Sequence, residues 1–198
     1  MQKLIMGCAG LAGAGKDTVA NAIKAYAEKI GPVAKLSFAD PMRAMLTALG
    51  VPYKYMVDRE LKERPVPGFG LSYRHMAQTL GTEWGRKCCG ADFWLQALAV
   101  EIEQSKAEIF LIADVRFPNE AQWITDQGGF LVRVHRPGIE PVIAHESEAH
   151  VAAMEPWFEF HNNGDLADLQ EGAIELLRNA ITQRVRSRSG SAAGYNEV

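Results

Sequence analysis

The sequence predicts an α/β protein built on a parallel β-sheet, because five short apolar runs alternate with helical patterns and a glycine-rich segment directly follows the first run. The runs are Lys3–Ala9, Ala34–Ala39, Ile109–Ala113, Phe130–His135 and Trp157–His161. The first and third are nearly continuous in apolar residues, which is typical of central parallel strands buried on both faces. We therefore expect a five-stranded parallel sheet flanked by helices.

Residues that start and stop helices stand between these runs. Asp40, followed by a proline, predicts the N-cap of a helix that ends at Gly50. Pro118 begins another helix, which ends at Gly128. Asp165 is predicted to cap the last helix. The apolar stripe of that helix is expected to pack on the core, and it comprises Leu166, Leu169, Ala173, Leu176, Leu177, Ala180 and Ile181.

The order of these patterns predicts one domain over residues 1–185. The stretch 40–106 has helical patterns but no clear strand, so we expect a helical insert between the second and third strands. Residues 136–150 follow the fourth strand and are predicted to form a mobile lid. Residues 186–198 are small, polar and aperiodic, which favours a flexible C-terminal tail.

Composition excludes several classes of protein. The formal net charge of −3 argues against a nucleic-acid-binding module, which needs a basic surface. No apolar stretch approaches the roughly 20 residues that cross a membrane. The three cysteines cannot all pair and lack zinc-binding spacing, so we expect free thiols in a reducing cytoplasm.

The glycine-rich segment has the spacing of a phosphate-binding loop. Such a loop wraps a polyphosphate with backbone N–H groups, so side chains at the glycine positions would block it, and the following helix points its positive end at the same phosphates. The lysine then reaches the β- and γ-phosphate oxygens. The residues expected to bind a nucleoside triphosphate are Gly10, Gly13, Ala14, Gly15, Lys16, Asp17 and Thr18.

One position departs from the common form of this motif, which has Ser or Thr directly after the lysine. Here Asp17 stands between Lys16 and Thr18, a form that resembles nucleoside monophosphate kinases. Thr18 is assigned to the magnesium site. Asp17 has two open roles: it contacts the ion through water, or it is an acid that stabilises the helix dipole.

A second acidic residue follows the third apolar run. Asp114 ends that run, beside the loop in a parallel sheet, and is expected to orient Mg²⁺ or its waters. Arg116 lies two residues further on, at the sheet edge where ligands of open α/β sheets bind. Its guanidinium is suited to a phosphate.

The helical insert carries candidates for binding the phosphate acceptor. Arg74 and Gln78 share one helical face, and Arg86 and Trp94 follow. An arginine would bind a phosphate, while an amide and an aromatic ring would recognise a base. An ordinary exposed helix face explains Arg74 and Gln78 nearly as well. Arg43, in the first helix of the insert, is also assigned to this site.

The predicted lid contains two further features. Arg136 either swings over the transferring phosphate or lies on the surface. The segment His145–Glu148 contains residue types that bind metals, but no second set matches it, so we favour lid or substrate contacts over a zinc site.

Taken together, the motifs resemble the phage-type deoxynucleoside monophosphate kinase family. The resemblance covers about residues 3–170 and rests on GLAGAGKDT, SFADPMR, the segment Gln78–Arg86 with Trp94, ADVRFPNEA, RVHRP, HESE and NNGDL. It implies the P-loop nucleotide-kinase fold, with residues 40–106 binding the acceptor. It also implies ATP as donor, Mg²⁺ as cofactor, and a donor-adenine pocket partly around residues 162–164. Asp40 and Glu120, within two of these segments, are assigned to the substrate site.

The reaction we expect is in-line transfer of the γ-phosphoryl group of ATP to the phosphate of a deoxynucleoside monophosphate. The residues expected to stabilise the transferring charge are Lys16, Arg116, Arg86 and Arg136. The alternatives are another small-molecule kinase, of the dephospho-coenzyme A or phosphomevalonate type, and a regulatory NTPase. We expect no nucleic-acid or membrane partner, and we consider a homodimer. We expect the protein in the cytoplasm, which is the host's cytoplasm if a phage encodes it.

Overall fold

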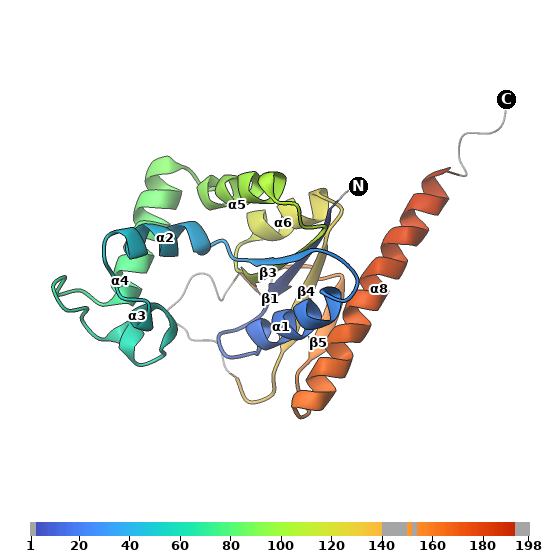
Figure 1. Ribbon diagram of the computed structural model, residues 1–198, viewed down its shortest axis with the longest axis horizontal. Helices are drawn as coiled ribbons and strands as arrows, with labels where there is room; N and C mark the ends of the chain where they lie inside the picture. The colour runs from blue at the N-terminus through green and yellow to red at the C-terminus, as the bar shows by residue number, and fades with distance from the viewer. Residues whose placement is uncertain (1–2, 140–149, 152–153, 193–198) are drawn as a thin grey trace. The chain divides into compact units, whose positions relative to one another are not determined.

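The computed structural model describes residues 3–139, 150–151 and 154–192, and the side chains among them up to residue 186. It contains a five-stranded sheet with the order β2-β3-β1-β4-β5 (Figure 1). The pairs β1–β3, β1–β4 and β4–β5 are all parallel. The chain divides into two compact units, and Leu36–Ser105 forms the second of them.

The five predicted strands are confirmed, with small shifts at their ends. The strands are β1 (Leu4–Ala9), β2 (Val33–Leu36), β3 (Ile109–Val115), β4 (Phe130–His135) and β5 (Phe158–His161). β2 ends before the predicted Ala39 because Ser37 folds the chain into a turn, in which its Oγ accepts a hydrogen bond from the Ala39 N–H at 3.2 Å. β3 runs two residues beyond the prediction and so includes Asp114.

Helices of the first unit cover both faces of the sheet. They are α1 (Lys16–Ala27), α6 (Pro118–Asp126) and α8 (Leu166–Ala192). Residues of α1 and α8 pack with alternate residues of β1, β3 and β4 into one large apolar cluster (Figure 1). On the opposite face, Ile124 of α6 packs so closely over Gly7 of β1 that a Cβ at this glycine would lie 2.5 Å from the Ile124 Cδ1.

The last helix packs largely as its stripe predicts. Leu169, Ala173, Leu177 and Ala180 are buried in the cluster that α8 shares with α1. Leu166 is different, because it is 60% exposed at the first turn of the helix. The helix also continues to Ala192, into the range 186–198 for which a flexible tail is predicted.

The second unit is helical, as predicted for the insert. Its elements are α2 (Asp40–Ala48), α3 (Lys54–Val57), the 3₁₀-helix η1 (Leu61–Glu63), α4 (Tyr73–Gln78), the π-helix η2 (Thr79–Cys89) and α5 (Phe93–Gln104). Within this unit, strand-like pairing is limited to a single antiparallel bridge between Pro65 and Ser72. It has a core of its own, formed by Leu46, Val51, Tyr55, Met56, Val66 and Tyr73.

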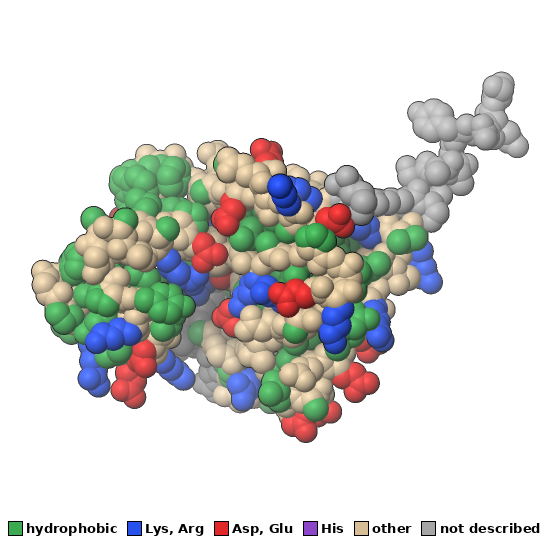
Figure 2. Space-filling model, viewed as in Figure 1, with side chains coloured by type: hydrophobic (Ala, Val, Ile, Leu, Met, Phe, Trp, Pro, Cys, Tyr) green, Lys and Arg blue, Asp and Glu red, His purple; other side chains and the backbone are tan. Residues whose placement is uncertain are grey.

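The surface carries both signs of charge. On the face drawn in Figure 2, acidic and basic side chains are interspersed, with no broad field of one sign. Hydrophobic side chains gather over the helical unit in the same view. The exposed hydrophobic residues of this unit include Tyr53, Val57 and Leu71. None of the helices in the described ranges has the length and apolar character needed to span a membrane.

Candidate active site

The loop after β1 has the backbone conformation that the glycine spacing predicts. Gly10, Gly13 and Gly15 have φ values of 152°, 83° and 96°, which L-residues with a side chain rarely adopt. Gly10 is also confined by its surroundings, because a Cβ there would lie 2.5 Å from the Val134 carbonyl oxygen of β4. These positions therefore require glycine for both conformational and steric reasons.

Lys16 is held over this loop. Its Nζ donates hydrogen bonds to the carbonyl oxygens of Gly10 at 2.7 Å and Leu11 at 2.8 Å, so the backbone curls around the ammonium group. Lys16 is also the first residue of α1, whose positive end faces the loop. A glycine-rich loop with a lysine ammonium, at a helix N-terminus, fits the phosphates of a nucleotide.

Two side chains from more distant parts of the first unit contact the loop. The Nδ2 of Asn162, directly after β5, donates a hydrogen bond to the Ala14 carbonyl oxygen at 3.0 Å. The Nη1 of Arg136, directly after β4, lies 3.5 Å from the Gly13 carbonyl oxygen. The structure thus brings Arg136 to the phosphate loop. The family resemblance placed Asn162 in a donor-adenine pocket, and its contact with the phosphate loop was not predicted.

Asp114 lies at an irregularity in β3. Gly7 of β1 pairs with Ile112, but Ala9 pairs with Val115, so β3 has one extra residue opposite Cys8. After this bulge the Val115 side chain lies over Gly7, on the face where regular alternation would have put Asp114. Bulges often redirect side chains next to active sites. The bulge therefore removes Asp114 from the regular alternation of side chains between the two faces of the sheet, at the strand next to the phosphate loop.

The segment after β3 is fixed by a buried carboxylate. Glu120 is 2% exposed, and its Oε2 accepts hydrogen bonds from the backbone N–H groups of Arg116 at 2.8 Å and Phe117 at 3.1 Å. Arg116 itself is exposed. These contacts make Glu120 a support for the backbone that carries Arg116, and its assignment to the substrate site stays a prediction.

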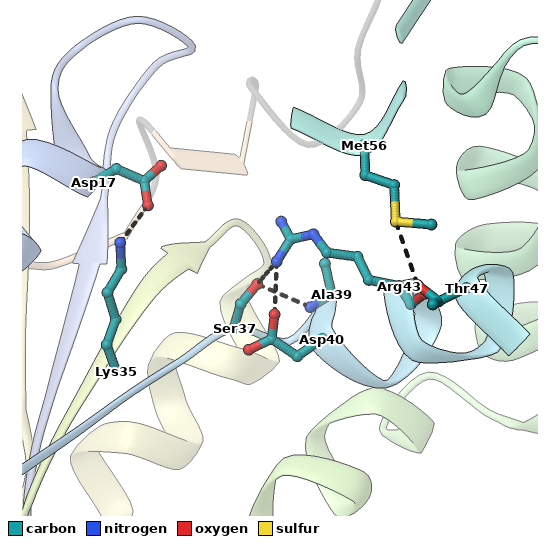
Figure 3. Close-up of polar contacts among 8 residues, drawn as sticks. All are labelled: Asp17, Lys35, Ser37, Ala39, Asp40, Arg43, Thr47 and Met56. Atoms are coloured by element: carbon teal, nitrogen blue, oxygen red, sulfur yellow. Dashed lines mark hydrogen bonds and ion pairs between the residues drawn. The ribbon is translucent and has the colours of Figure 1, made fainter. Parts of the chain in front are cut away.

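Asp17 and Thr18 are exposed in the first turn of α1. The Asp17 carboxylate forms an ion pair with Lys35 of β2 at 2.8 Å (Figure 3). No group of three or more His, Cys, Asp or Glu side chains able to hold a metal ion occurs within the described ranges. A nucleotide-bound Mg²⁺ needs only one or two protein ligands, and Asp114 and Thr18 stay the predicted ones.

In the second unit, Asp40 and Arg43 form an ion pair at 2.7 Å (Figure 3). Arg43 Nη1 also donates to the Ser37 Oγ at 3.2 Å. The prediction of Asp40 as an N-cap is wrong, because Asp40 is already the first residue of α2 and Ala39 holds the cap position. The Asp40 carboxylate instead fixes the guanidinium of Arg43 one turn away.

Arg74 and Gln78 lie on α4, one turn apart. Arg74 Nε forms a hydrogen bond and ion pair with Glu63 of η1. After Gln78 the chain widens into the π-helix η2, which the sequence did not predict. Arg86 lies on η2, and its Nη1 donates to the Ala91 carbonyl oxygen at 3.0 Å. π-Helices frequently occur at functional sites.

Trp94 is an interior residue of this unit. It is 4% exposed, its Nε1 donates to the Gly81 carbonyl oxygen at 2.7 Å, and its ring fills the space beside Gly85. A Cβ at Gly85 would lie 2.4 Å from Trp94 Nε1. This burial gives no support to the predicted contact between Trp94 and a base. Trp84 packs edge-to-face on Phe93 with 5.2 Å between ring centroids. It is more exposed than Trp94, at 39%.

The remaining predictions concern residues outside the described ranges. Most of the predicted lid, 136–150, and the whole of the segment His145–Glu148 lie there. In the first unit, Arg136 and Asn162 contact the loop Gly10–Thr18, and Asp114 and Arg116 stay predicted members of the site.

A glycine loop around a lysine, between a central parallel strand and a helix, defines a P-loop nucleotide-binding protein. The chain belongs to the deoxynucleotide monophosphate kinase family, whose model matches residues 68–173. That match begins after the glycine loop, so the loop is independent support for the class. The protein is thus an enzyme of the nucleotide kinase class, and the predicted family is confirmed.

Two curated relatives agree with this assignment. A putative deoxynucleotide monophosphate kinase of Acanthamoeba polyphaga mimivirus is 27% identical over 89% of this chain and 97% of its own length. The deoxynucleoside-5'-monophosphate kinase of Escherichia phage T5 is 34% identical over 37% of this chain and 31% of its own length. Among solved structures, shikimate kinase from Aquifex aeolicus is 11% identical with a TM-score of 0.48, over 92% of this chain and 98% of that one.

Proposed function

We propose that this protein transfers the γ-phosphoryl group of ATP to a deoxynucleoside monophosphate, giving ADP and a deoxynucleoside diphosphate. The observation that carries the proposal is the loop Gly10–Gly15 curled around the Lys16 ammonium, in a chain of the deoxynucleotide monophosphate kinase family. The loop supports binding of the donor's phosphates, and the family supports a nucleotide acceptor.

In the proposed reaction an oxygen of the acceptor phosphate attacks the γ-phosphorus in line, and the bond to the β–γ bridging oxygen breaks. The acceptor phosphate is already ionised at neutral pH, so no general base is required. Lys16 neutralises charge on the β- and γ-phosphate oxygens, and Arg116, Arg86 and Arg136 add positive charge around the transferring group. Catalysis then consists of positioning and charge stabilisation.

Mg²⁺ would be held by Asp114 and Thr18 together with the donor phosphates, and would neutralise part of their charge. The residues present fit such an ion, because Asp114 is a carboxylate at a bulge of the strand beside the loop. Arg43, Arg74, Gln78 and Arg86 of the second unit would bind the acceptor.

The test is ADP release from ATP, measured against a panel of deoxyribonucleoside and ribonucleoside monophosphates, with dephospho-coenzyme A and phosphomevalonate included. We expect turnover with one or more deoxynucleoside monophosphates, stopped by EDTA and restored by Mg²⁺. Turnover with dephospho-coenzyme A or phosphomevalonate alone would instead assign another small-molecule kinase. ATP hydrolysis that no acceptor stimulates would contradict phosphoryl transfer altogether.

A further inference from the structure

Asn162 makes a contact that reaches across the first unit to the phosphate loop. Its Nδ2 donates to the Ala14 carbonyl oxygen at 3.0 Å and lies 2.5 Å from the position that a Cβ of Gly15 would take. The side chain therefore occupies space that is open only because residue 15 is glycine. Ala14 is 1% exposed, so this carbonyl depends on protein partners rather than on solvent.

The backbone around Asn162 is fixed on both sides. Its N–H donates to the His135 carbonyl oxygen of β4 at 2.7 Å. Three residues later, the Asp165 Oδ1 accepts hydrogen bonds from the N–H groups of Ala167 at 2.7 Å and Asp168 at 3.0 Å, which caps α8. The side-chain amide of Asn162 thus contacts the loop from a backbone that is hydrogen-bonded to β4.

This contact determines the orientation of one peptide group in the loop. The peptide bond between Ala14 and Gly15 is trans, so its C=O and its N–H point in opposite directions. Because Asn162 holds the Ala14 carbonyl on one side, the Gly15 N–H must point to the other. We propose that Asn162 is a positioning residue that directs the Gly15 N–H at the phosphates of the donor nucleotide.

The inference rests on the proposed function for the identity of the nucleotide that donates the phosphoryl group. It adds a physical cause for the shape of the loop. A backbone N–H that already points at the phosphate site needs no reorganisation when the nucleotide binds. The contact would act on any polyphosphate equally, because it works through a backbone N–H and not through the base or sugar. That feature separates it from a direct contact between Asn162 and the nucleoside.

The experiment compares Asn162→Leu, which keeps the approximate shape and removes the donor, with Asn179→Leu as a matched control on the exposed side of α8. MgATP and inorganic tripolyphosphate are each titrated by calorimetry. We expect Asn162→Leu to weaken both ligands by about fivefold to tenfold, the range for one lost hydrogen bond. The control should bind both as the wild type does. Asn162→Ser, too short to reach the carbonyl, provides a second variant if the leucine prevents folding.

Equal weakening of the two ligands, in a variant whose circular dichroism matches that of the folded wild type, supports the inference. Weakening of MgATP alone would overturn it, because Asn162 would then contact the nucleoside. Unchanged affinity for both ligands would overturn it as well. The readout needs no acceptor, so a protein that binds both ligands but phosphorylates no deoxynucleoside monophosphate contradicts the proposed function and leaves this inference standing. A wild type that binds neither ligand contradicts both.

Discussion

The Lys35 ammonium lies 2.8 Å from the carboxylate of Asp17, the residue that directly follows the phosphate-loop lysine (Figure 3). Lys35 also donates to the Asn21 Oδ1 at 2.9 Å, one turn further along α1. The pair therefore joins strand β2 to the first turn of the helix. Of the two roles that the sequence left open for Asp17, these contacts favour the acid that stabilises the helix N-terminus.

This relationship predicts that Asp17 and Asp114 differ in their effect on the metal. Asp114→Asn should raise the Mg²⁺ concentration for half-maximal rate by at least about fivefold, because it removes a charged ligand. Asp17→Asn should leave that concentration within about twofold and lower the unfolding free energy by less than about 1 kcal/mol, as for an exposed ion pair. The measurement is a Mg²⁺ titration of the initial rate. An equal rise of this Mg²⁺ concentration in the two variants would assign Asp17 to the metal site.

Removing the loop lysine should stop the reaction without unfolding the protein. Lys16→Ala is expected to lower kcat by at least ~10³, because charge stabilisation at the transferring group is lost. Lys24→Ala, on the same helix and paired with Glu28 in an exposed ion pair, is the matched control and should retain kcat. Steady-state rates and circular dichroism check the two variants together. Near-normal turnover in Lys16→Ala would exclude this lysine from the mechanism.

Recognition of phosphate and base should be separable in the acceptor site. Arg116→Ala should weaken every nucleoside monophosphate alike by about 1.5–3 kcal/mol, because all carry the same phosphate. Gln78→Ala should change the ranking among bases, because an amide reads a particular hydrogen-bonding edge.

The measurement is kcat/KM for each acceptor, with Gln170→Ala on the exposed side of α8 as the amide control. Neither variant should alter ATP affinity. If Gln78→Ala lowers kcat/KM by the same factor for all acceptors, Gln78 does not recognise the base. If neither variant affects any acceptor, the acceptor pocket involves other residues.

Cys8 of β1 should make the protein sensitive to alkaline pH. Burial raises the pKa of its thiol from 9.0 to about 12, because the thiolate would lose hydration. Between these values the unfolded chain has lost the proton and the folded chain keeps it, so stability falls as pH rises above 9. The free energy of unfolding should decline by up to about 1.4 kcal/mol per pH unit from this group.

Denaturant unfolding of the wild type and Cys8→Ala at pH 8, 9 and 10 checks this expectation. The difference in unfolding free energy between the two proteins should be constant up to about pH 8. At higher pH the wild type should lose stability relative to Cys8→Ala. A difference that stays constant to pH 10 would show that the thiol titrates normally in the folded protein.

The sequence alone determined the elements whose signals are local. All five strands and the loop after β1 could be predicted, because apolar runs and glycine spacing act over a few neighbouring residues. The starts of α6 and α8 could be predicted for the same reason, since Pro118 and Asp165 each act on the turn that follows them. The family was also recognisable, because its motifs are short segments.

The tertiary structure alone decided which residues contact the loop and which are buried. The bulge at Asp114 lies in the pairing between two strands, and Trp94 of α5 packs beside Gly85 and donates to the Gly81 carbonyl of the π-helix η2. Asn162 reaches Ala14 across 148 positions of sequence, and no local pattern carries such a contact. A hydrogen bond between distant segments depends on how the strands bring the chain together, so only the folded structure shows it.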